Sequence, residues 1–120
     1  MSVQKGRDAE AVAADHLQAD GFSVLWRNVR IGALEIDLVA KKADLVIIVE
    51  VRSRGEGSFT KPLESVTRAK RRHLLSASRG LWRGRLKKMP DVMRVRIDVM
   101  AVAQDGSVEW IKGAITEQDG

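Results

Sequence analysis

Four charged residues interrupt two apolar segments of the sequence, residues 34–40 and 45–52. They are Glu35, Asp37, Glu50 and Arg52. Neighbouring carboxylates repel one another unless a cation lies between them, and carboxylate oxygens are the ligands that Mg²⁺ and Mn²⁺ prefer. These residue types therefore predict a metal site, provided that the chain brings the acids together.

Alternation within the two segments predicts a hairpin with its charged residues on one face. The acids of residues 34–40 occupy odd positions, whereas Glu50 and Arg52 occupy even positions. A turn centred on Lys42-Ala43 pairs residues whose numbers sum to 85, which leaves the opposite face apolar. Glu35 then lies opposite Glu50, and Asp37 is a diagonal neighbour about 7–8 Å away.

Alternation alone leaves two interpretations of this face open. In the first, the acids share Mg²⁺ or Mn²⁺, and Glu10 is a candidate third carboxylate because it lies on the inward stripe of a helix predicted over residues 6–19. In the second, the face is exposed to solvent and Arg52 and Arg54 pair with the acids.

The elements that must position these residues follow the order α-β-β-β-α-β-β. Hydrophobic periodicity predicts helices over residues 6–19 and from Thr60 or Pro62 to about residue 80. Strands are predicted over residues 22–30, 34–40, 45–53, 92–103 and 107–113. Because a helix connects the third and fourth strands, we expect those two strands to be parallel in a mixed sheet, within one domain of residues 1–120.

Three local predictions accompany this order. In the first strand, Phe22, Val24 and Trp26 should share one face. The SRGEGS stretch at residues 53–58 is predicted as a flexible loop, and the glycine-broken, basic residues 80–91 are predicted as a mobile loop.

Composition narrows the class of protein. Cysteine is absent, which excludes disulfides, thiolate nucleophiles and zinc–thiolate sites. No apolar run reaches the ~18 residues of a membrane span, so we expect a cytoplasmic protein without a membrane partner.

Residues 65–90 hold nine Lys and Arg and no acid, although the whole chain has a net charge of only +5. This segment predicts a phosphate-binding surface, or alternatively a solvated helix face.

Five motifs carry a resemblance to a known family. They are GRDAE at 6–10, NVR at 28–30, LEIDLVA at 34–40, VEVRSR at 49–54 and RIDVM at 96–100. With them the chain resembles the YraN-like family of uncharacterised bacterial proteins, which is related to Holliday-junction resolvases in the PD-(D/E)xK superfamily. The resemblance implies an α/β, restriction-endonuclease-like fold with a mixed sheet flanked by helices.

The resemblance also implies roles for individual residues. Asp37 and Glu50 correspond to metal ligands for Mg²⁺ or Mn²⁺, and Glu10 corresponds to an auxiliary catalytic acid. Arg52 stands where superfamily nucleases usually have lysine. Arginine stays charged and cannot act as a base, but it can stabilise negative charge on phosphate.

The leading hypothesis is a divalent-metal-dependent DNA endonuclease that acts on branched DNA. Nucleic-acid contacts are expected from a basic set: Arg54, Arg68, Lys70, Arg71 and Arg72. Trp82 either anchors the core or stacks on an exposed base. Two alternatives remain: a catalytically inactive nucleic-acid-binding module on the same fold, and a protein-interaction domain, such as a homodimer, with a basic face.

Overall fold

The computed structural model describes residues 7–54 and 61–119. Its elements follow the predicted order α-β-β-β-α-β-β. The helices and strands are α1 (Arg7–Ala19), β1 (Ser23–Ile31), β2 (Leu34–Lys42), β3 (Leu45–Arg54), α2 (Arg68–Gly84), β4 (Arg94–Ala103) and β5 (Val108–Ile115). Short 3₁₀ helices are η1 (Pro62–Ser65), η2 (Leu86–Lys88) and η3 (Glu117–Asp119).

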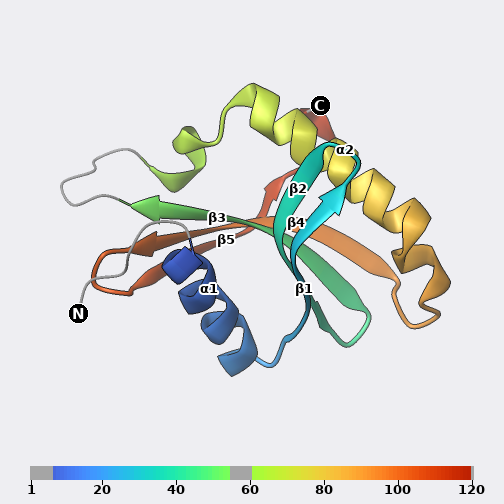
Figure 1. The fold of residues 1–120 in the computed structure, drawn as a ribbon, viewed down its shortest axis with the longest axis horizontal. Helices are drawn as coiled ribbons and strands as arrows, with labels where there is room; N and C mark the ends of the chain where they lie inside the picture. The colour runs from blue at the N-terminus through green and yellow to red at the C-terminus, as the bar shows by residue number, and fades with distance from the viewer. Residues whose placement is uncertain (1–6, 55–60, 120) are drawn as a thin grey trace.

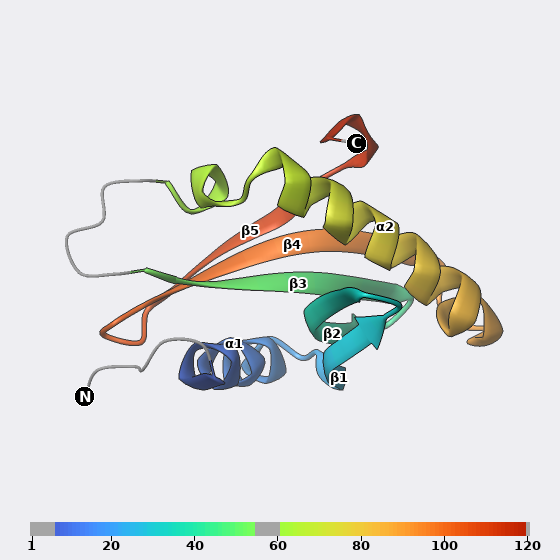
Figure 2. The ribbon, with the colours of Figure 1, turned by 45° about the horizontal axis from the view of Figure 1, so that its top comes forward.

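The five strands form one mixed sheet in the order β1-β2-β3-β4-β5. Neighbouring strands are antiparallel except β3 and β4, which are parallel and joined through α2, as predicted. Helix α1 covers one face of the sheet and α2 covers the other (Figures 1 and 2). The predicted fold class, an α/β mixed sheet flanked by helices, is therefore confirmed.

The core under α1 is built on small residues. Ala9, Ala13, Ala14 and Leu17 are almost fully buried and recur on one side of the helix. Alanine side chains let the helix lie close to the sheet, where they contact the apolar residues of β2, β3 and β4. The helix ends where Gly21 adopts a left-handed φ of 96°, which a residue with a side chain rarely adopts.

The core under α2 is larger and more branched. Thr67 caps the helix, since its hydroxyl oxygen accepts a hydrogen bond from the Lys70 N–H at 3.1 Å. Leu74, Ala77 and Leu81 are buried in this core, which includes apolar residues of all five strands.

The second predicted helix and the loop after it differ from the structure. The segment begins as η1 and becomes α-helical only from Arg68, because Val66 and Thr67 are extended. Residues 80–91, predicted as a mobile loop, instead continue α2 to Gly84 and bury Leu86. Gly80 explains the error: an added Cβ there would lie 2.4 Å from the Ile31 Cγ2, so this glycine serves close packing. Of the predicted loop 53–58, Ser53 and Arg54 belong to β3, and residues 55–58 lie outside the described residues.

Strand β1 does not keep Phe22, Val24 and Trp26 on one face, contrary to prediction. Its register with β2 shifts between Val24 and Trp26. This bulge sends Phe22 and Val24 into the core under α1, whereas Trp26 packs against the core under α2.

The predicted register of β2 and β3 is wrong by two residues. Lys42 pairs with Leu45 and Leu38 pairs with Val49, so the paired numbers sum to 87. The turn lies at Ala43-Asp44, with Ala43 at a φ of 53°. A shift of two preserves which side chains share a face where the strands pair, and it places Asp37 rather than Glu35 next to Glu50. The prediction that residues 34–40 have one continuous apolar face is wrong, because Leu38 and Ala40 pack under α1 whereas Leu34 and Ile36 pack under α2.

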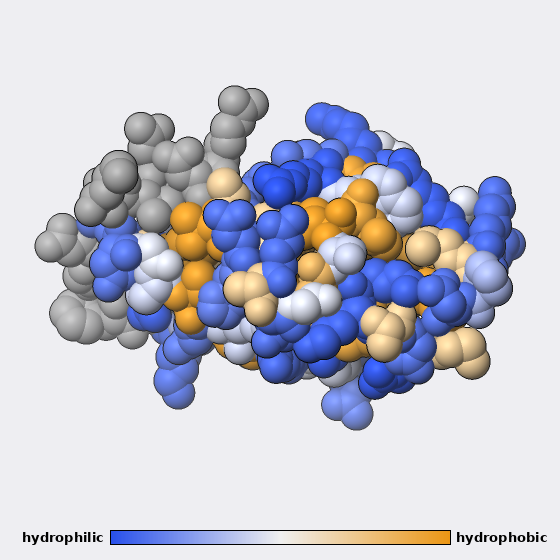
Figure 3. Space-filling model, turned by 90° about the horizontal axis from the view of Figure 1, so that it is seen from below, coloured by the Kyte–Doolittle hydropathy of each residue, from blue (hydrophilic) through white to orange (hydrophobic). Residues whose placement is uncertain are grey.

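Surface and hydropathy add two observations. The face seen from below in Figure 3 is mostly hydrophilic, with small separate patches of hydrophobic residues. Neither α1 nor α2, nor any other helix within residues 7–54 and 61–119, has the length and apolar content needed to cross a membrane.

Candidate functional site

A gap opens in the sheet where β2 turns away from β3. Pairing of the two strands extends from Lys42↔Leu45 to Leu38↔Val49. The pairing ends at Leu38, which packs under α1, whereas Ile36, two residues earlier in β2, packs under α2. The strand is therefore twisted at Asp37, so that the side chains before and after it exchange faces. The Val51 N–H, left without a strand carbonyl at this point, donates instead to the Asp37 Oδ2 at 2.8 Å. The Asp37 carboxylate is thereby fixed in orientation at the edge of the gap.

Glu50 is buried beside Asp37 with an unmatched oxygen. The residue is 3% exposed, and its Oε1 has no hydrogen-bond partner among the described residues. Burial first, and the negative charge of Asp37 second, raise the pKa of Glu50 to about 7. The Lys70 ammonium, 3.7 Å from Oε1, acts in the opposite direction. A buried, unsatisfied carboxylate oxygen next to a second carboxylate is costly unless the two share a proton or a metal cation.

Asp98 provides the contrast. It is also fully buried, but both of its oxygens are satisfied. They accept hydrogen bonds from Arg96 at 2.8 Å to each oxygen, from the Trp110 indole N–H at 2.8 Å and from the Gly113 N–H at 2.9 Å. This hydrogen bonding also raises the pKa of Arg96. The acid of the RIDVM motif therefore anchors β5 to β4, and it has no oxygen left for a ligand.

Glu10 and Asn28 border the gap from the side of α1. Burial raises the pKa of Glu10, and the charge of Asp37 raises it as well. With its amide nitrogen turned toward the acids, Asn28 donates to the Glu10 Oε2 at 3.1 Å and to the Glu35 Oε1 at 3.2 Å. Asn28 adopts a left-handed φ of 51°, which asparagine tolerates better than most residues. Sequence reasoning gave this asparagine no role beyond its place in the NVR motif.

Arg52 is held by the segment that precedes α2. Its Nε donates to the Ser65 Oγ at 3.3 Å and its Nη2 donates to the Ser65 carbonyl at 3.1 Å. Its Nη1 lies 3.4 Å from the Glu50 Oε2. Arg52 therefore links β3 to η1 and neutralises one side of Glu50, while Lys70 approaches the other oxygen.

The acids fit a small, hard cation. Within residues 7–54 and 61–119, no group of three or more His, Cys, Asp or Glu side chains is arranged to hold a metal ion. A pair remains, Asp37 and Glu50. Mg²⁺ is commonly bound by one or two carboxylates and keeps several waters. The unmatched Glu50 Oε1 and the repulsion between the two carboxylates are both relieved by such an ion.

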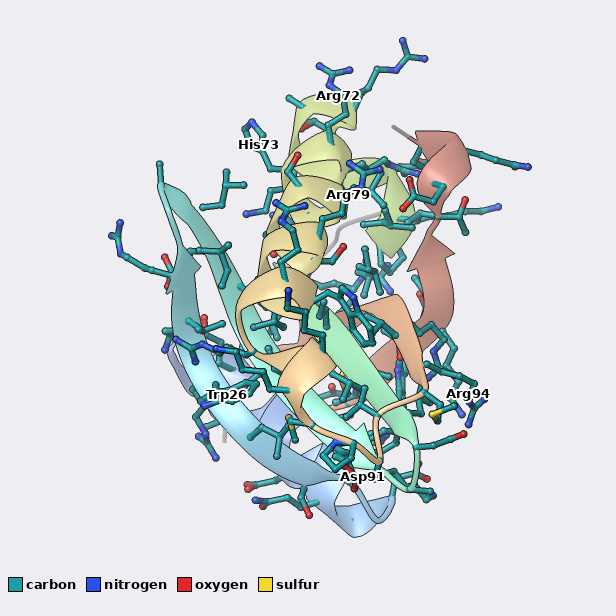
Figure 4. All side chains as sticks on the ribbon, turned by 90° about the vertical axis from the view of Figure 1, so that its right-hand side faces the viewer. Trp26, Arg72, His73, Arg79, Asp91 and Arg94 are labelled. Carbon is teal, nitrogen blue, oxygen red and sulfur yellow. The ribbon has the colours of Figure 1, made fainter. Side chains whose placement is uncertain are left out.

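The basic residues of α2 divide into two groups. Arg71 is engaged within the protein, since it donates to the Val66 carbonyl at 3.0 Å, the Leu63 carbonyl at 2.8 Å and the Asp119 Oδ1 at 3.1 Å. An exposed set lies along the outer side of the helix: Arg68, Arg72, Arg79 and Arg83. In Figure 4, Arg72 projects at one end of α2, and Arg79 lies on the side nearer the C-terminal segment. Arg54 lies at the end of β3.

Comparisons with known proteins identify relatives along almost the whole chain. The model of the Uncharacterised protein family UPF0102 matches residues 9–102. A UPF0102 protein from Sorangium cellulosum is 38% identical over 113 residues, which cover 91% of this chain and 78% of that protein. Another from Vibrio cholerae is 34% identical over 117 residues, covering 97% and 95%. The crystal structure of an XisH family protein from Nostoc punctiforme covers 86% of this chain and 98% of its own, with 14% identity and a TM-score of 0.49.

Proposed function

The chain belongs to the uncharacterised protein family UPF0102, and from its site we propose that it is a divalent-metal-dependent endonuclease acting on branched DNA. The observation that carries the proposal is the buried Glu50, whose Oε1 lacks a partner while Asp37 lies beside it. An acid pair of this kind at the end of buried strands, below a basic helix, is what the resemblance to PD-(D/E)xK nucleases leads one to expect.

Asp37 and Glu50 would hold Mg²⁺ or Mn²⁺. When bound, such an ion polarises a phosphate oxygen and lowers the pKa of a water molecule. The protein's own part is to fix the two carboxylates: the Val51 N–H orients Asp37, and Arg52 orients Glu50. The charge of Asp37 acts on Glu10 and, together with burial, raises the pKa of Glu10. A carboxylate with a raised pKa is a stronger base, so Glu10 is the group best suited to accept a proton from water.

Lys70 takes over the role that the superfamily gives to a lysine at position 52. Its ammonium approaches the Glu50 Oε1 from α2, whereas Arg52 is held by Ser65. The arginine in the VEVRSR motif then leaves the chemistry intact, because a lysine reaches the same acid from another element.

The exposed arginines of α2 would contact the DNA backbone. Such contacts position a duplex without reading its sequence, and among the described residues no helix or strand presents a set of base-reading side chains for the major groove. Selectivity for branched DNA then depends on shape.

A nucleic-acid-binding module without catalysis is the second candidate. It is favoured by the state of Arg52, whose guanidinium is already used by Ser65 and Glu50 and so has little capacity left for a phosphate. The two candidates differ in cleavage and share DNA binding.

The test incubates the purified protein with four-way-junction, flap and linear DNA in Mg²⁺, Mn²⁺ or EDTA. We expect metal-dependent cleavage of the branched substrates, lost in Asp37→Asn and in Lys70→Met. Asp91→Asn is the matched control, because Asp91 is an exposed acid paired with Lys41. Mn²⁺ binding measured by calorimetry should likewise be lost in Asp37→Asn. DNA that is bound but never cut would select the binding module, and an Asp37→Asn protein that cuts normally would refute the acid pair.

A further inference from the structure

A groove separates the second half of α2 from the sheet on the side of β5. Its volume is about 480 Å³. It forms because β5 pairs with β4 only from Ile97↔Ile115 onward, so that β4 is uncovered where the chain leaves the sheet toward η3. Ile97 and Ile115 are part of its lining, and both are buried. The site acids take no part in this groove.

The groove has an aromatic wall. Trp82 lines it and is 39% exposed, although most large apolar side chains of the described residues are buried. Val95, 37% exposed, lies across the same groove. A half-exposed indole beside a concave apolar surface offers a flat ring a place to stack.

The rim of the groove is cationic. Arg79 and Arg83 line it and are exposed. Arg79 pairs with Glu117, but both side chains are solvent-exposed, so this ion pair contributes little and yields readily to a phosphate. Helical geometry places Arg68, Arg72, Arg79 and Arg83 within an arc of about 60°, along about 22 Å of α2. The arginines thus form a line along the outer side of α2 that ends at the groove.

We infer that the groove binds an unpaired nucleobase of DNA, stacked on Trp82, while the phosphates of the same strand follow the exposed arginines. This inference rests on the proposed DNA-binding function and names its substrate: DNA that carries an unpaired nucleotide near the scissile position. Lys70 and Trp82 are twelve residues apart on α2. That spacing corresponds to about 18 Å, or about five nucleotide steps of a stacked strand.

A nucleobase fits the groove better than a peptide strand does. The uncovered part of β4 would also accept an extended peptide, which would need backbone pairing and no cationic rim. The arginine line along α2 complements the regular negative charge of a nucleic-acid strand, and the aromatic wall complements a base of any sequence. The arginine line and the indole of Trp82 lie on neighbouring sides of the same helix, α2.

The test compares a fully paired duplex with the same duplex carrying one unpaired adenine, in EDTA, by fluorescence anisotropy. We expect the wild-type protein to bind the unpaired substrate about tenfold more tightly, as a stacked base contributes. Trp82→Leu should abolish that preference and leave affinity for the paired duplex unchanged, and Trp82→Phe should retain it in part. Val95→Glu, at an exposed position, should also abolish it by placing a carboxylate in the groove. With 2-aminopurine as the unpaired base, binding should quench its fluorescence in the wild type only.

The outcomes separate this inference from the proposed function. If the wild type binds both duplexes equally, or if Trp82→Leu keeps the preference, the base groove is refuted while DNA binding stands. If no DNA is bound at all, both proposals fail. If the preference is present but branched DNA is never cut, the nuclease is refuted and the base groove is retained.

Discussion

Replacing Glu50 with glutamine should stabilise the metal-free protein at neutral and alkaline pH. Glu50 is buried beside Asp37, and one of its oxygens has no partner. Glutamine has nearly the same shape and carries no charge at any pH. The substitution therefore removes the cost of an ionised, buried carboxylate without opening a cavity.

The magnitude follows from the pKa of Glu50, about 7 in the folded protein against an ordinary value of 4.5. Because this pKa is raised, the folded state keeps its proton up to about pH 7, whereas the unfolded state loses it near 4.5. The contribution of Glu50 to the free energy of unfolding is then greatest below pH 4.5 and falls as the pH rises to about 7. At about 1.4 kcal/mol per pH unit, the loss amounts to about 3 kcal/mol. Glu50→Gln should abolish that loss.

Urea unfolding monitored by tryptophan fluorescence, in EDTA at pH 4.5 and pH 8, measures the effect. We expect Glu50→Gln to be close to wild type at the lower pH and more stable at the higher pH, by up to about 3 kcal/mol. Glu109→Gln is the control, because Glu109 is exposed on β5; its effect should stay within about 0.5 kcal/mol at both pH values.

Mn²⁺ should reverse the order of stability. An ion that binds only the folded wild type stabilises it, while Glu50→Gln gains nothing. If Glu50→Gln is instead less stable than wild type by the same amount at both pH values, Glu50 is satisfied in solution, and both the raised pKa and the cation site are refuted.

Three further predictions concern packing and charge. Gly80→Ala should destabilise the protein, because the added Cβ would lie 2.4 Å from the Ile31 Cγ2. Gly84→Ala should stabilise the same helix by up to about 1 kcal/mol, because no atom lies within 4 Å of the added Cβ. Equal shifts in Tm for the two variants would refute the close contact at Gly80. Ala43→Gly should stabilise by about 0.5–1 kcal/mol in urea unfolding, because alanine is strained at a φ of 53°, and a loss of stability would show the turn to be unstrained. Arg72→Glu should weaken DNA binding and reduce the salt dependence of that binding without changing Tm. Arg71→Glu should lower Tm, because it breaks the hydrogen bonds of Arg71 with Leu63, Val66 and Asp119. Similar Tm values for the two variants would contradict the assignment of Arg71 to a structural role and of Arg72 to DNA binding.

The element order and the faces of β3 could be predicted from alternation and periodicity. The register of β2 and β3 was predicted two residues away from the observed one, and alternation along β2 did not reveal that Ile36 and Leu38 pack under different helices. A slip of two residues preserves which side chains share a face. The apolar pattern therefore shows which residues of a strand point to the same side, but the position of the turn decides which residues of the two strands pair. Ala43, at the turn, is not a residue type that signals a left-handed φ, and so the turn position was not visible.

Features that depend on distant contacts were not predictable. Gly80 looked like a helix breaker, and only its contact with Ile31 shows why glycine is needed inside α2. Lys70 was expected on the DNA-binding surface, but α2 crosses the sheet where its ammonium approaches Glu50. Asn28 joins Glu10 to Glu35 only because β1 kinks at a left-handed residue. Each of these positions depends on how a helix or a kinked strand lies over the sheet, which local patterns do not encode.

The hydrogen bond from the Val51 N–H to Asp37 makes the backbone of β3 a reporter of the site. Protonation of the carboxylate, or its engagement by a cation, changes the electron density on the oxygen that this amide contacts. The ¹⁵N resonance of Val51 should therefore shift with occupancy at Asp37, and its hydrogen exchange should slow when the carboxylate is fixed. A single amide signal can thus follow ligand binding in the native protein, without a substrate and without any introduced label beyond the isotope.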